Sequence, residues 1–504
     1  MSLKKLFPIF IVLFTAFFHQ SILAQDVRVT ILHVNDVYQF MPVDGGTRGG
    51  LARLITLKNQ IKRENPNTIF TLGGDTISPS VETLTYKGAQ MIDAWNAVGI
   101  DYAVFGNHEF DLKTPILLER MKESKFKWLG ANVFDTETKK IFADTPPFVI
   151  REFDGVKVGI IGLLLPETKE TSSMADNLKV EDFCETAKKY VPEMRKAGAN
   201  AVVGLTHLFM AQDKKLAKCA DFDLILGGHE HTLLQSSSNG TPIFKMTADA
   251  RELGRFNLNF NRQTRKLESI DWEIIPVTDK IADAPEFAAV FDKYKDLLQK
   301  LAEPIGRTAV VLDARSESNR TQETNIANFI ADAFRNATNA DIGFLNGGSI
   351  RADLTYNPGT LTKRDILSML PFNNPVVKIE ILGRTLREAL EHGVARSAED
   401  AEPGRFPQVS GLTYKFDTSR PAGSRIVEAK VAGEPIKDSK IYTLATTSFL
   451  ALNGGDGYAM FKNGKVLTNL NQAQKDAEIL ENAVKNAPDK LISPKVEGRV
   501  VRIK

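Results

Sequence analysis

Short apolar runs alternate with amphipathic stretches through the first half of the chain. Six mostly apolar runs have the length and composition of buried strands: residues 27–33, 69–72, 102–105, 156–163, 201–205 and 223–226. Stretches with apolar side chains at helical spacing lie among them, at residues 51–61, 90–98 and 181–197. Strands that alternate with helices in this way predict a layered α/β domain.

Polar side chains follow several of these runs, near the point where each predicted strand ends. The residues at these points are Asp36, Asp75, Asn107, His108, His207, His229 and His231. Open α/β sheets carry their chemistry at the carboxyl ends of their strands, so we expect these side chains to gather at one edge of the domain. Four of the seven histidines in the chain lie in three of these loops. His19, His33 and His392 are interpreted as ordinary polar residues.

This set of side chains has the chemistry of a metal site. Carboxylates, imidazoles and one amide suit Zn, Mn or Fe. Asp75, which follows two glycines, is the best candidate for an aspartate that bridges two ions, and a spacing of about 3.5–4 Å between such ions supports in-line attack at phosphorus. Asp111, three residues after His108, can hydrogen-bond the imidazole and determine its tautomer. Taken alone, the stretch around His108 is also compatible with a polar turn of no catalytic role.

The second half of the chain has a different organisation. Residues 285–302 have helical periodicity between polar or helix-breaking flanks, which predicts a linker. Gly-rich loops at residues 346–351 and 453–458 follow later apolar runs. We therefore predict four segments: a signal peptide at residues 1–24, a catalytic domain at 25–278, a linker helix at 279–303 and a smaller α/β substrate-binding domain at 304–504.

The first residues and the composition indicate an exported protein. Lys4 and Lys5 precede an apolar run that ends near Ala24, as in a secretory signal peptide, and this interpretation is favoured over an uncleaved anchor. We expect a periplasmic or secreted protein without a membrane anchor. The 64 basic and 62 acidic residues balance, which argues against a nucleic acid polymer as partner. Cys184 and Cys219 are the two cysteines, and both a disulfide and two free thiols remain open.

The motifs together resemble a known family. They are Asn35-Asp36, Gly73-Gly-Asp75, Gly106-Asn-His-Glu-Phe-Asp111, Thr206-His207 and Gly228-His-Glu-His231. This set resembles the calcineurin-like metallophosphoesterases, and with the second domain it resembles the secreted 5′-nucleotidases, which include periplasmic UDP-sugar hydrolases. The resemblance implies a layered α/β/β/α sandwich followed by a smaller α/β domain that binds the nucleoside.

The resemblance also implies roles for individual residues. One divalent ion would be held by Asp36, Asp75 and His231, and a second by Asp75, Asn107, His207 and His229. His108, oriented by Asp111, would stabilise the charge that develops on the phosphoryl or leaving oxygen. The substrate would be bound by residues of the second domain: Arg320, Asn346, Arg351, Phe372, Phe449 and Asp456.

Several of these assignments have alternatives. Phe372 and Phe449 match a pair of rings that sandwich a base, and both are also compatible with core packing. The spacing from Phe449 to Asp456 is one residue longer than usual in the family. Tyr38 stands where the family usually has a histidine. It is compatible with a missing ligand, with a phenolate ligand to ferric iron or with simple packing, and we favour a residue that is not a ligand.

We predict a two-metal phosphohydrolase that acts on nucleoside 5′-monophosphates, with nucleotide sugars as further candidate substrates. A sugar-phosphate phosphatase is an alternative on the same scaffold, because the Asp36-x-Tyr38 pattern resembles a less characterised branch of the family, some of whose members act on sugar phosphates. A 2′,3′-cyclic-nucleotide phosphodiesterase is another alternative. A binding protein without catalytic activity is a more remote alternative.

Overall fold

The computed structural model describes residues 26–397 and 403–504. The predicted signal peptide at residues 1–24 therefore lies outside the described residues. Within the described part of the chain, no helix is long and apolar enough to cross a membrane.

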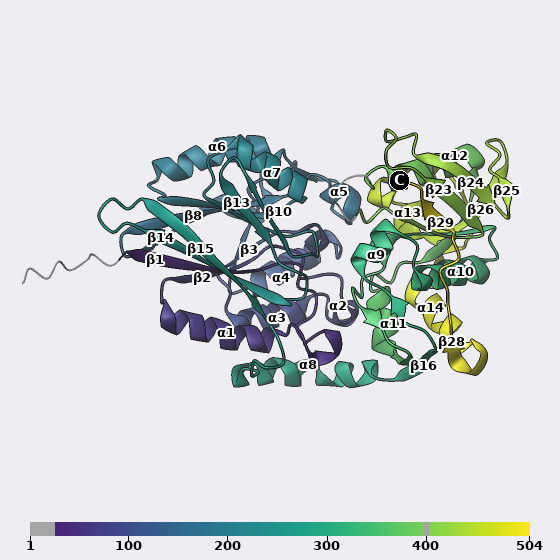
Figure 1. The fold of residues 1–504 in the computed structure, drawn as a ribbon, viewed down its shortest axis with the longest axis horizontal. Helices are drawn as coiled ribbons and strands as arrows, with labels where there is room; N and C mark the ends of the chain where they lie inside the picture. Colours follow the sequence, from purple (N-terminus) through teal and green to yellow (C-terminus); the bar gives the residue numbers. More distant parts are fainter. Residues whose placement is uncertain (1–25, 398–402) are drawn as a thin grey trace, which may run out of the picture.

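Two six-stranded sheets form the first half of the molecule (Figure 1). The first has the order β15-β14-β1-β2-β3-β4 and contains β1 (Val27–Val34), β2 (Thr68–Leu72), β3 (Tyr102–Val104), β4 (Lys127–Leu129), β14 (Glu252–Phe260) and β15 (Leu267–Pro276). The second has the order β12-β13-β11-β10-β8-β7 and contains β7 (Phe148–Phe153), β8 (Val156–Leu164), β10 (Ala201–His207), β11 (Leu224–Gly227), β12 (Leu234–Ser238) and β13 (Thr241–Lys245). Strands β1, β2 and β3 run parallel, as do β8, β10, β11 and β13.

Alternation of side chains along the strands explains the layers. In β1, Val29 and Ile31 belong to the core between the two sheets, whereas Leu32 and Val34 belong to the core under the helices. The helices that cover the outer faces include α1 (Leu51–Glu64), α3 (Ala89–Val98), α4 (Thr114–Glu123), α6 (Phe183–Lys196) and α7 (Met210–Cys219). Successive side chains of a strand point to opposite faces, so both faces are buried. The predicted α/β/β/α sandwich is confirmed.

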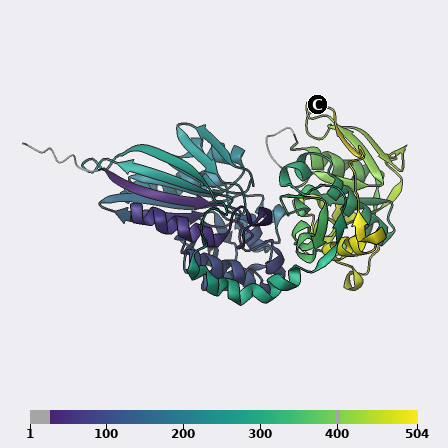
Figure 2. The same ribbon diagram turned by 60° about the horizontal axis from the view of Figure 1, so that its bottom comes forward.

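Small elements connect and extend this sandwich. The helices are α2 (Val81–Tyr86) and α5 (Thr168–Thr171), with the 3-10 turn η2 (Asn107–Phe110). A three-stranded sheet contains β5 (Val133–Asp135), β6 (Lys140–Ile141) and β9 (Leu178–Val180). Helix α8 (Ala288–Leu301) lies inside the predicted linker and runs along one edge of the sandwich toward the second half (Figure 2). The domain boundaries at residues 278 and 304 stay predictions.

The second half is a smaller α/β domain with two apolar cores. Its five-stranded sheet has the order β22-β18-β26-β21-β27, with β18 (Ile342–Asn346), β21 (Val376–Leu382), β22 (Pro407–Ser410), β26 (Ile441–Thr447) and β27 (Lys465–Val466). A four-stranded sheet contains β23 (Leu412–Phe416), β24 (Ile426–Val431), β25 (Glu434–Pro435) and β29 (Val500–Arg502). Shorter pairings contain β16 (Pro304–Thr308), β17 (Leu312–Asp313), β19 (Thr355–Tyr356), β20 (Gly359–Thr362) and β28 (Leu491–Ile492).

The helices of this domain surround its sheets. They are α9 (Ser316–Thr321), α10 (Asn325–Thr338), α11 (Lys363–Met369), α12 (Gly383–Val394), α13 (Ser448–Ala451) and α14 (Asp476–Lys485). The short turn η6 (Gly455–Gly457) lies in the second Gly-rich loop. Arg364 of α11 pairs with Glu82 of α2 at 2.8 Å, so the two domains are in direct contact.

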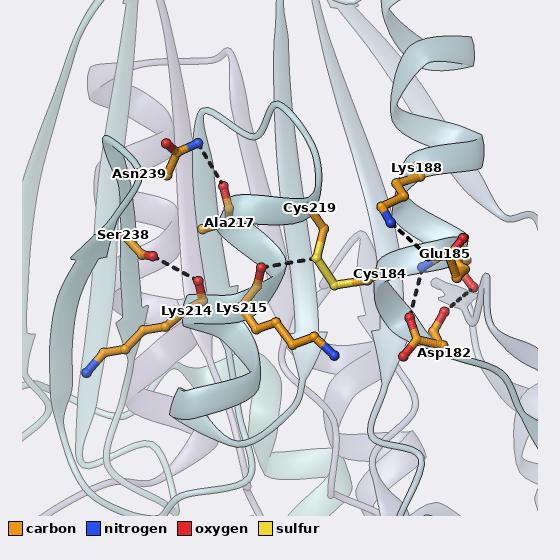
Figure 3. The surroundings of a disulfide bond; sticks show 11 residues. Asp182, Cys184, Glu185, Lys188, Lys214, Lys215, Ala217, Cys219, Ser238 and Asn239 are labelled. Carbon is orange, nitrogen blue, oxygen red and sulfur yellow. Dashed lines mark hydrogen bonds and ion pairs between the residues drawn. A yellow bond between two sulfur atoms is a disulfide. The ribbon is translucent and has the colours of Figure 1, made fainter.

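A disulfide joins Cys184 of α6 to Cys219 of α7 (Figure 3). The two cysteines are 35 residues apart in the sequence. The sequence left free thiols and a bridge open, and the structure contains the bridge.

Reduction of this disulfide is expected to lower the free energy of unfolding by about 2–4 kcal/mol, because the bridge restricts the unfolded chain. The measurement is thermal or denaturant unfolding with and without reductant. A Cys184→Ala/Cys219→Ala variant is the control, since its stability should not respond to reductant. An intact protein whose stability is equally insensitive would contradict the bridge.

Candidate active site

The predicted metal ligands meet at one edge of the sandwich. Asp36, Asp75 and Asn107 follow β1, β2 and β3 of the first sheet, while His207 ends β10 of the second sheet. His229 and His231 lie in the loop after β11. Because these are parallel strands in two stacked sheets, their carboxyl ends open toward the same place. The structure thus brings all six predicted ligands into one cluster.

Three of these side chains form a compact group. Potential ligand atoms of Asp36, Asp75 and His207 all lie within 4.8 Å of one another, and all three residues are buried. Asp75 Oδ1 accepts a hydrogen bond from the His108 backbone at 2.8 Å. Its Oδ2 faces His207 Nε2 at 3.3 Å and the Tyr38 hydroxyl at 3.0 Å. Asp75 Oδ2 therefore lies between the two predicted metal positions, as a bridging ligand requires.

The backbone supports this geometry at some cost in strain. Asp36, Asp75 and His229 have φ values of 52°, 56° and 85°, a region that non-glycine residues rarely adopt and that is typical of functional sites. Gly106 leaves room for the aspartate, because a Cβ there would lie 2.1 Å from Asp75 Oδ1.

The atoms of the second predicted metal position fit a cation. His207 Nδ1 lies 2.8 Å from the carbonyl oxygen of Gly73. When Nδ1–H donates a hydrogen bond to this oxygen, Nε2 keeps its lone pair. That Nε2 faces Asn107 Oδ1 at 3.2 Å and His229 Nδ1 at 3.3 Å. Burial lowers the pKa of His229 well below its usual range, so this imidazole is neutral. Asn107 Oδ1, His229 Nδ1 and Asp75 Oδ2 therefore all lie 3.2–3.3 Å from His207 Nε2.

Without a bound cation, a proton on His207 supplies the positive charge at this position. Burial alone would lower the pKa of His207, but the carboxylates of Asp75 and Asp36 outweigh it and raise the pKa to about 9. The two carboxylates thus favour a positive charge at this position, as a bound divalent metal ion would supply. The donor set fits the divalent metal that the family resemblance implies.

The first predicted metal position is formed by Asp36, Asp75 and His231, with Tyr38 beside them. Asp36 Oδ2 accepts hydrogen bonds from Asn35 Nδ2 at 2.7 Å and from the His229 backbone at 2.9 Å, and its Oδ1 lies 3.6 Å from His231 Nε2. The Tyr38 hydroxyl lies 3.2 Å from the same Nε2. Tyr38 therefore contacts predicted ligands and does more than fill space. Its assignment as a residue that is not a ligand stays a prediction.

His108 and Asp111 form a pair beside the ligands. His108 Nδ1 lies 2.8 Å from Asp111 Oδ2, and Ser78 donates its hydroxyl to the same oxygen at 2.9 Å. A carboxylate only accepts hydrogen bonds, so Nδ1 carries a proton and Nε2 faces Asp75 at 4.0 Å. This arrangement orients Nε2 for proton transfer or charge stabilisation.

A cavity of about 340 Å³ connects this edge with the second domain. Its walls include Asp75, Asn107, His108, Asp111, His229, His231, Arg320, Asn346, Arg351, Phe372, Phe449 and Asp456. All six predicted substrate-binding residues therefore line the same cavity as the predicted catalytic pair. The cavity is bounded by both domains, so a ligand there contacts both.

The second-domain residues approach the ligands closely. The Arg351 guanidinium lies 4.9 Å from the centroid of the Tyr38 ring and 5.9 Å from that of Phe372, and its Nη2 is 3.5 Å from His231 Nε2. The Phe372 and His108 ring centroids are 5.7 Å apart.

The other end of the cavity is formed around Asp456. Asn346 Nδ2 donates to Asp456 Oδ2 at 2.5 Å, and Asp456 has a φ of 53°. The Phe449 ring packs on Gly455, where a Cβ would lie 2.3 Å from it. The longer spacing between Phe449 and Asp456 therefore does not remove Phe449 from the cavity. Phe449 also contacts the apolar core.

Sequence reasoning missed several residues that hold the site. Glu109 accepts hydrogen bonds from the backbones of Asp75, Gly106 and Thr76 at 2.6–2.8 Å, so it shapes two loops. Asp249 accepts from the Tyr38 backbone at 2.9 Å. Glu109 could have been suspected because it stands between two site residues, whereas Asp249 has no signal in the sequence. His33 is a satisfied buried histidine as expected, and burial lowers its pKa to about 4.

Comparisons with known proteins agree with this geometry. Residues 29–233 match the family model of the calcineurin-like phosphoesterases, and residues 304–463 match that of the 5′-nucleotidase C-terminal domain. Fold and site therefore define a metallophosphoesterase, a phosphoric monoester hydrolase. The chain is 30% identical to the 5′-nucleotidases of Diplobatis ommata and of Homo sapiens, with 94% of this chain and 90% of each relative covered. The chain belongs to the 5′-nucleotidase family.

A longer relative and a solved structure are also similar to this chain. The trifunctional nucleotide phosphoesterase YfkN of Bacillus subtilis is 29% identical over 94% of this chain, which spans only 35% of that protein. The crystal structure of a 5′-nucleotidase precursor from Thermus thermophilus superposes with a TM-score of 0.87 at 28% identity, covering 94% of this chain and 99% of the other. The predicted family and the predicted enzyme class are confirmed.

Proposed function

We propose that the protein is a two-metal phosphohydrolase that releases phosphate from nucleoside 5′-monophosphates. The observation that carries this proposal is one cavity whose walls contain His108, Arg351, Phe372 and Phe449 together with four predicted metal ligands, Asp75, Asn107, His229 and His231. The phosphate would lie at the carboxylates and histidines, and the base would lie against the aromatic rings. Relatives named 5′-nucleotidase support the same substrate class.

The residues have distinct parts in this reaction. Asp36, Asp75 and His231 would hold one ion, and Asp75, Asn107, His207 and His229 would hold the other. Bound divalent ions supply Lewis-acid polarisation of the phosphoryl group and activation of water. In its imidazolium form, with the Nδ1 proton held by Asp111, His108 would donate its Nε2 proton to the leaving 5′ oxygen. Arg351, beside His231, would bind phosphoryl oxygens and hold the group in line.

Export is part of the proposal. The predicted signal peptide and the disulfide between Cys184 and Cys219 both favour an oxidising compartment. We propose that the protein acts in the periplasm or outside the cell, where such an enzyme would recover phosphate and nucleoside.

The substrate class is tested by phosphate release from a panel. The panel contains AMP, UDP-glucose, 2′,3′-cyclic AMP and several sugar phosphates, each with added Mn²⁺ or Zn²⁺. We expect the highest kcat/KM with AMP. A preference for sugar phosphates would refute the nucleotide assignment, and cleavage of UDP-glucose beside AMP would extend it to nucleotide sugars.

Phe372→Ala is expected to raise the KM for AMP by roughly 5–150-fold, because stacking on an aromatic ring is worth about 1–3 kcal/mol per base. A sugar phosphate has no base to stack, so its KM and kcat should change little. It serves as the internal control. Equal effects on AMP and on the sugar phosphate would return Phe372 to a packing role.

A further inference from the structure

One buried ammonium lies behind the histidine loops. Lys245 is the last residue of β13, and its side chain is fully buried. Its Nζ pairs with Asp213 Oδ2 at 2.9 Å and with the Glu230 carboxylate. It also donates to the carbonyl oxygens of Gly228, at 2.8 Å, and of Leu208. Burial alone would lower the pKa of Lys245, but the Asp213 and Glu230 carboxylates outweigh it and raise the pKa, so the group is charged.

Every partner of this ammonium is next to a predicted metal ligand or tied to one. Leu208 follows His207, Gly228 precedes His229, and Glu230 stands between His229 and His231. Asp213 Oδ1 accepts the hydroxyl of Thr206, the residue before His207, at 2.7 Å. One side chain thus joins the backbones that carry three imidazoles.

Glu230 also links this network to helix α7. Glu230 Oε1 accepts a hydrogen bond from the Met210 backbone at 2.6 Å, which ties the loop after β11 to the start of α7. A fully buried ion cluster gains little stability relative to an apolar core of the same shape, so such clusters are better explained by the conformation they specify. Here that conformation includes the left-handed backbone of His229.

We propose that Lys245 is a positioning residue for the metal centre, which sets the directions of His207, His229 and His231 through Leu208, Gly228 and Glu230. This inference rests on the proposed metal-dependent function. Lys245 lies outside the wall of the cavity, so it acts through the histidines and not on the substrate. Outer residues that orient metal ligands are typically worth about 10–100-fold in metal affinity.

The test is a Co²⁺ titration of the chelated full-length protein, followed by the visible spectrum. Lys245→Met should raise the Co²⁺ concentration for half-saturation by about 10-fold or more and should change the band shape, because the imidazoles lose their orientation. Lys58→Met is the matched control, since Lys58 donates to the Val98 carbonyl at 2.5 Å outside the metal centre. The Lys58→Met titration should match that of the wild type.

Wild-type affinity and spectrum in Lys245→Met would overturn the positioning role. If circular dichroism shows that Lys245→Met does not fold, Glu230→Gln is titrated instead, and it should show the same weakening in a folded chain. Unchanged Co²⁺ binding in Glu230→Gln would then overturn the inference. Absence of Co²⁺ binding by the wild type would overturn the proposed function as well, so the two failures are distinguishable.

Discussion

Asp75→Asn is expected to remove both predicted ions and to lower phosphate release by about 10³-fold or more, because metal ions provide most of the charge stabilisation in such sites. Potential ligand atoms of Asp75, of Asp36 in the first predicted metal position and of His207 in the second lie within 4.8 Å of one another, so both predicted positions depend on Asp75. An amide has one oxygen and no charge, and its NH₂ group would point donors at ligand atoms.

Metal content after gel filtration and turnover of AMP measure this effect together. Asp271→Asn, on the exposed face of β15 and 2.7 Å from Asn259, is the matched control and should retain both metal and activity. Full metal occupancy in Asp75→Asn would show that Asp75 does not bridge.

His108→Ala is expected to lower kcat for AMP by roughly 10²–10⁴-fold while metal content stays unchanged, since this is the usual contribution of a positioned acid or base. His108 is absent from the predicted ligand set, and its side chain is held by Asp111 at 2.8 Å. Loss of the ring therefore removes a proton donor without opening the metal centre.

The leaving group provides the internal control for His108. A nitrophenyl phosphate has a leaving oxygen that needs little protonation, so His108→Ala should lose less activity with it than with AMP. Asp111→Asn should show the same selectivity with a smaller loss, because the ring remains but its tautomer is no longer held. Unchanged turnover of AMP in His108→Ala would refute the assigned role.

The sequence was sufficient to predict those site residues that directly follow a strand. Each predicted ligand follows a short apolar strand, and the parallel order of those strands brings Asp36, Asp75 and His207 within 4.8 Å of one another. The alternation of strands with helices likewise predicted a layered α/β domain, and the family resemblance specified the α/β/β/α sandwich.

The remainder depended on contacts between distant segments. Lys245 donates to the Leu208 carbonyl 37 residues earlier in the chain. The pattern of apolar and polar residues along the sequence does not predict such a contact. Arg351 comes from the other domain to lie 3.5 Å from His231. The direction of the Tyr38 hydroxyl could not be predicted either. The Tyr38 backbone N–H is held by a hydrogen bond to the Asp249 side chain, 211 residues away in the sequence. Such contacts follow from tertiary packing and not from local pattern.

Two divalent ions at this site are proposed to promote phosphate release from a nucleoside 5′-monophosphate. Titration of the chelated protein with Mn²⁺, with phosphate release from AMP as the readout, tests this proposal. We expect no release without metal and a plateau of activity near two Mn²⁺ per chain. Release that is independent of Mn²⁺, or a plateau at one ion per chain, would contradict the two-metal site.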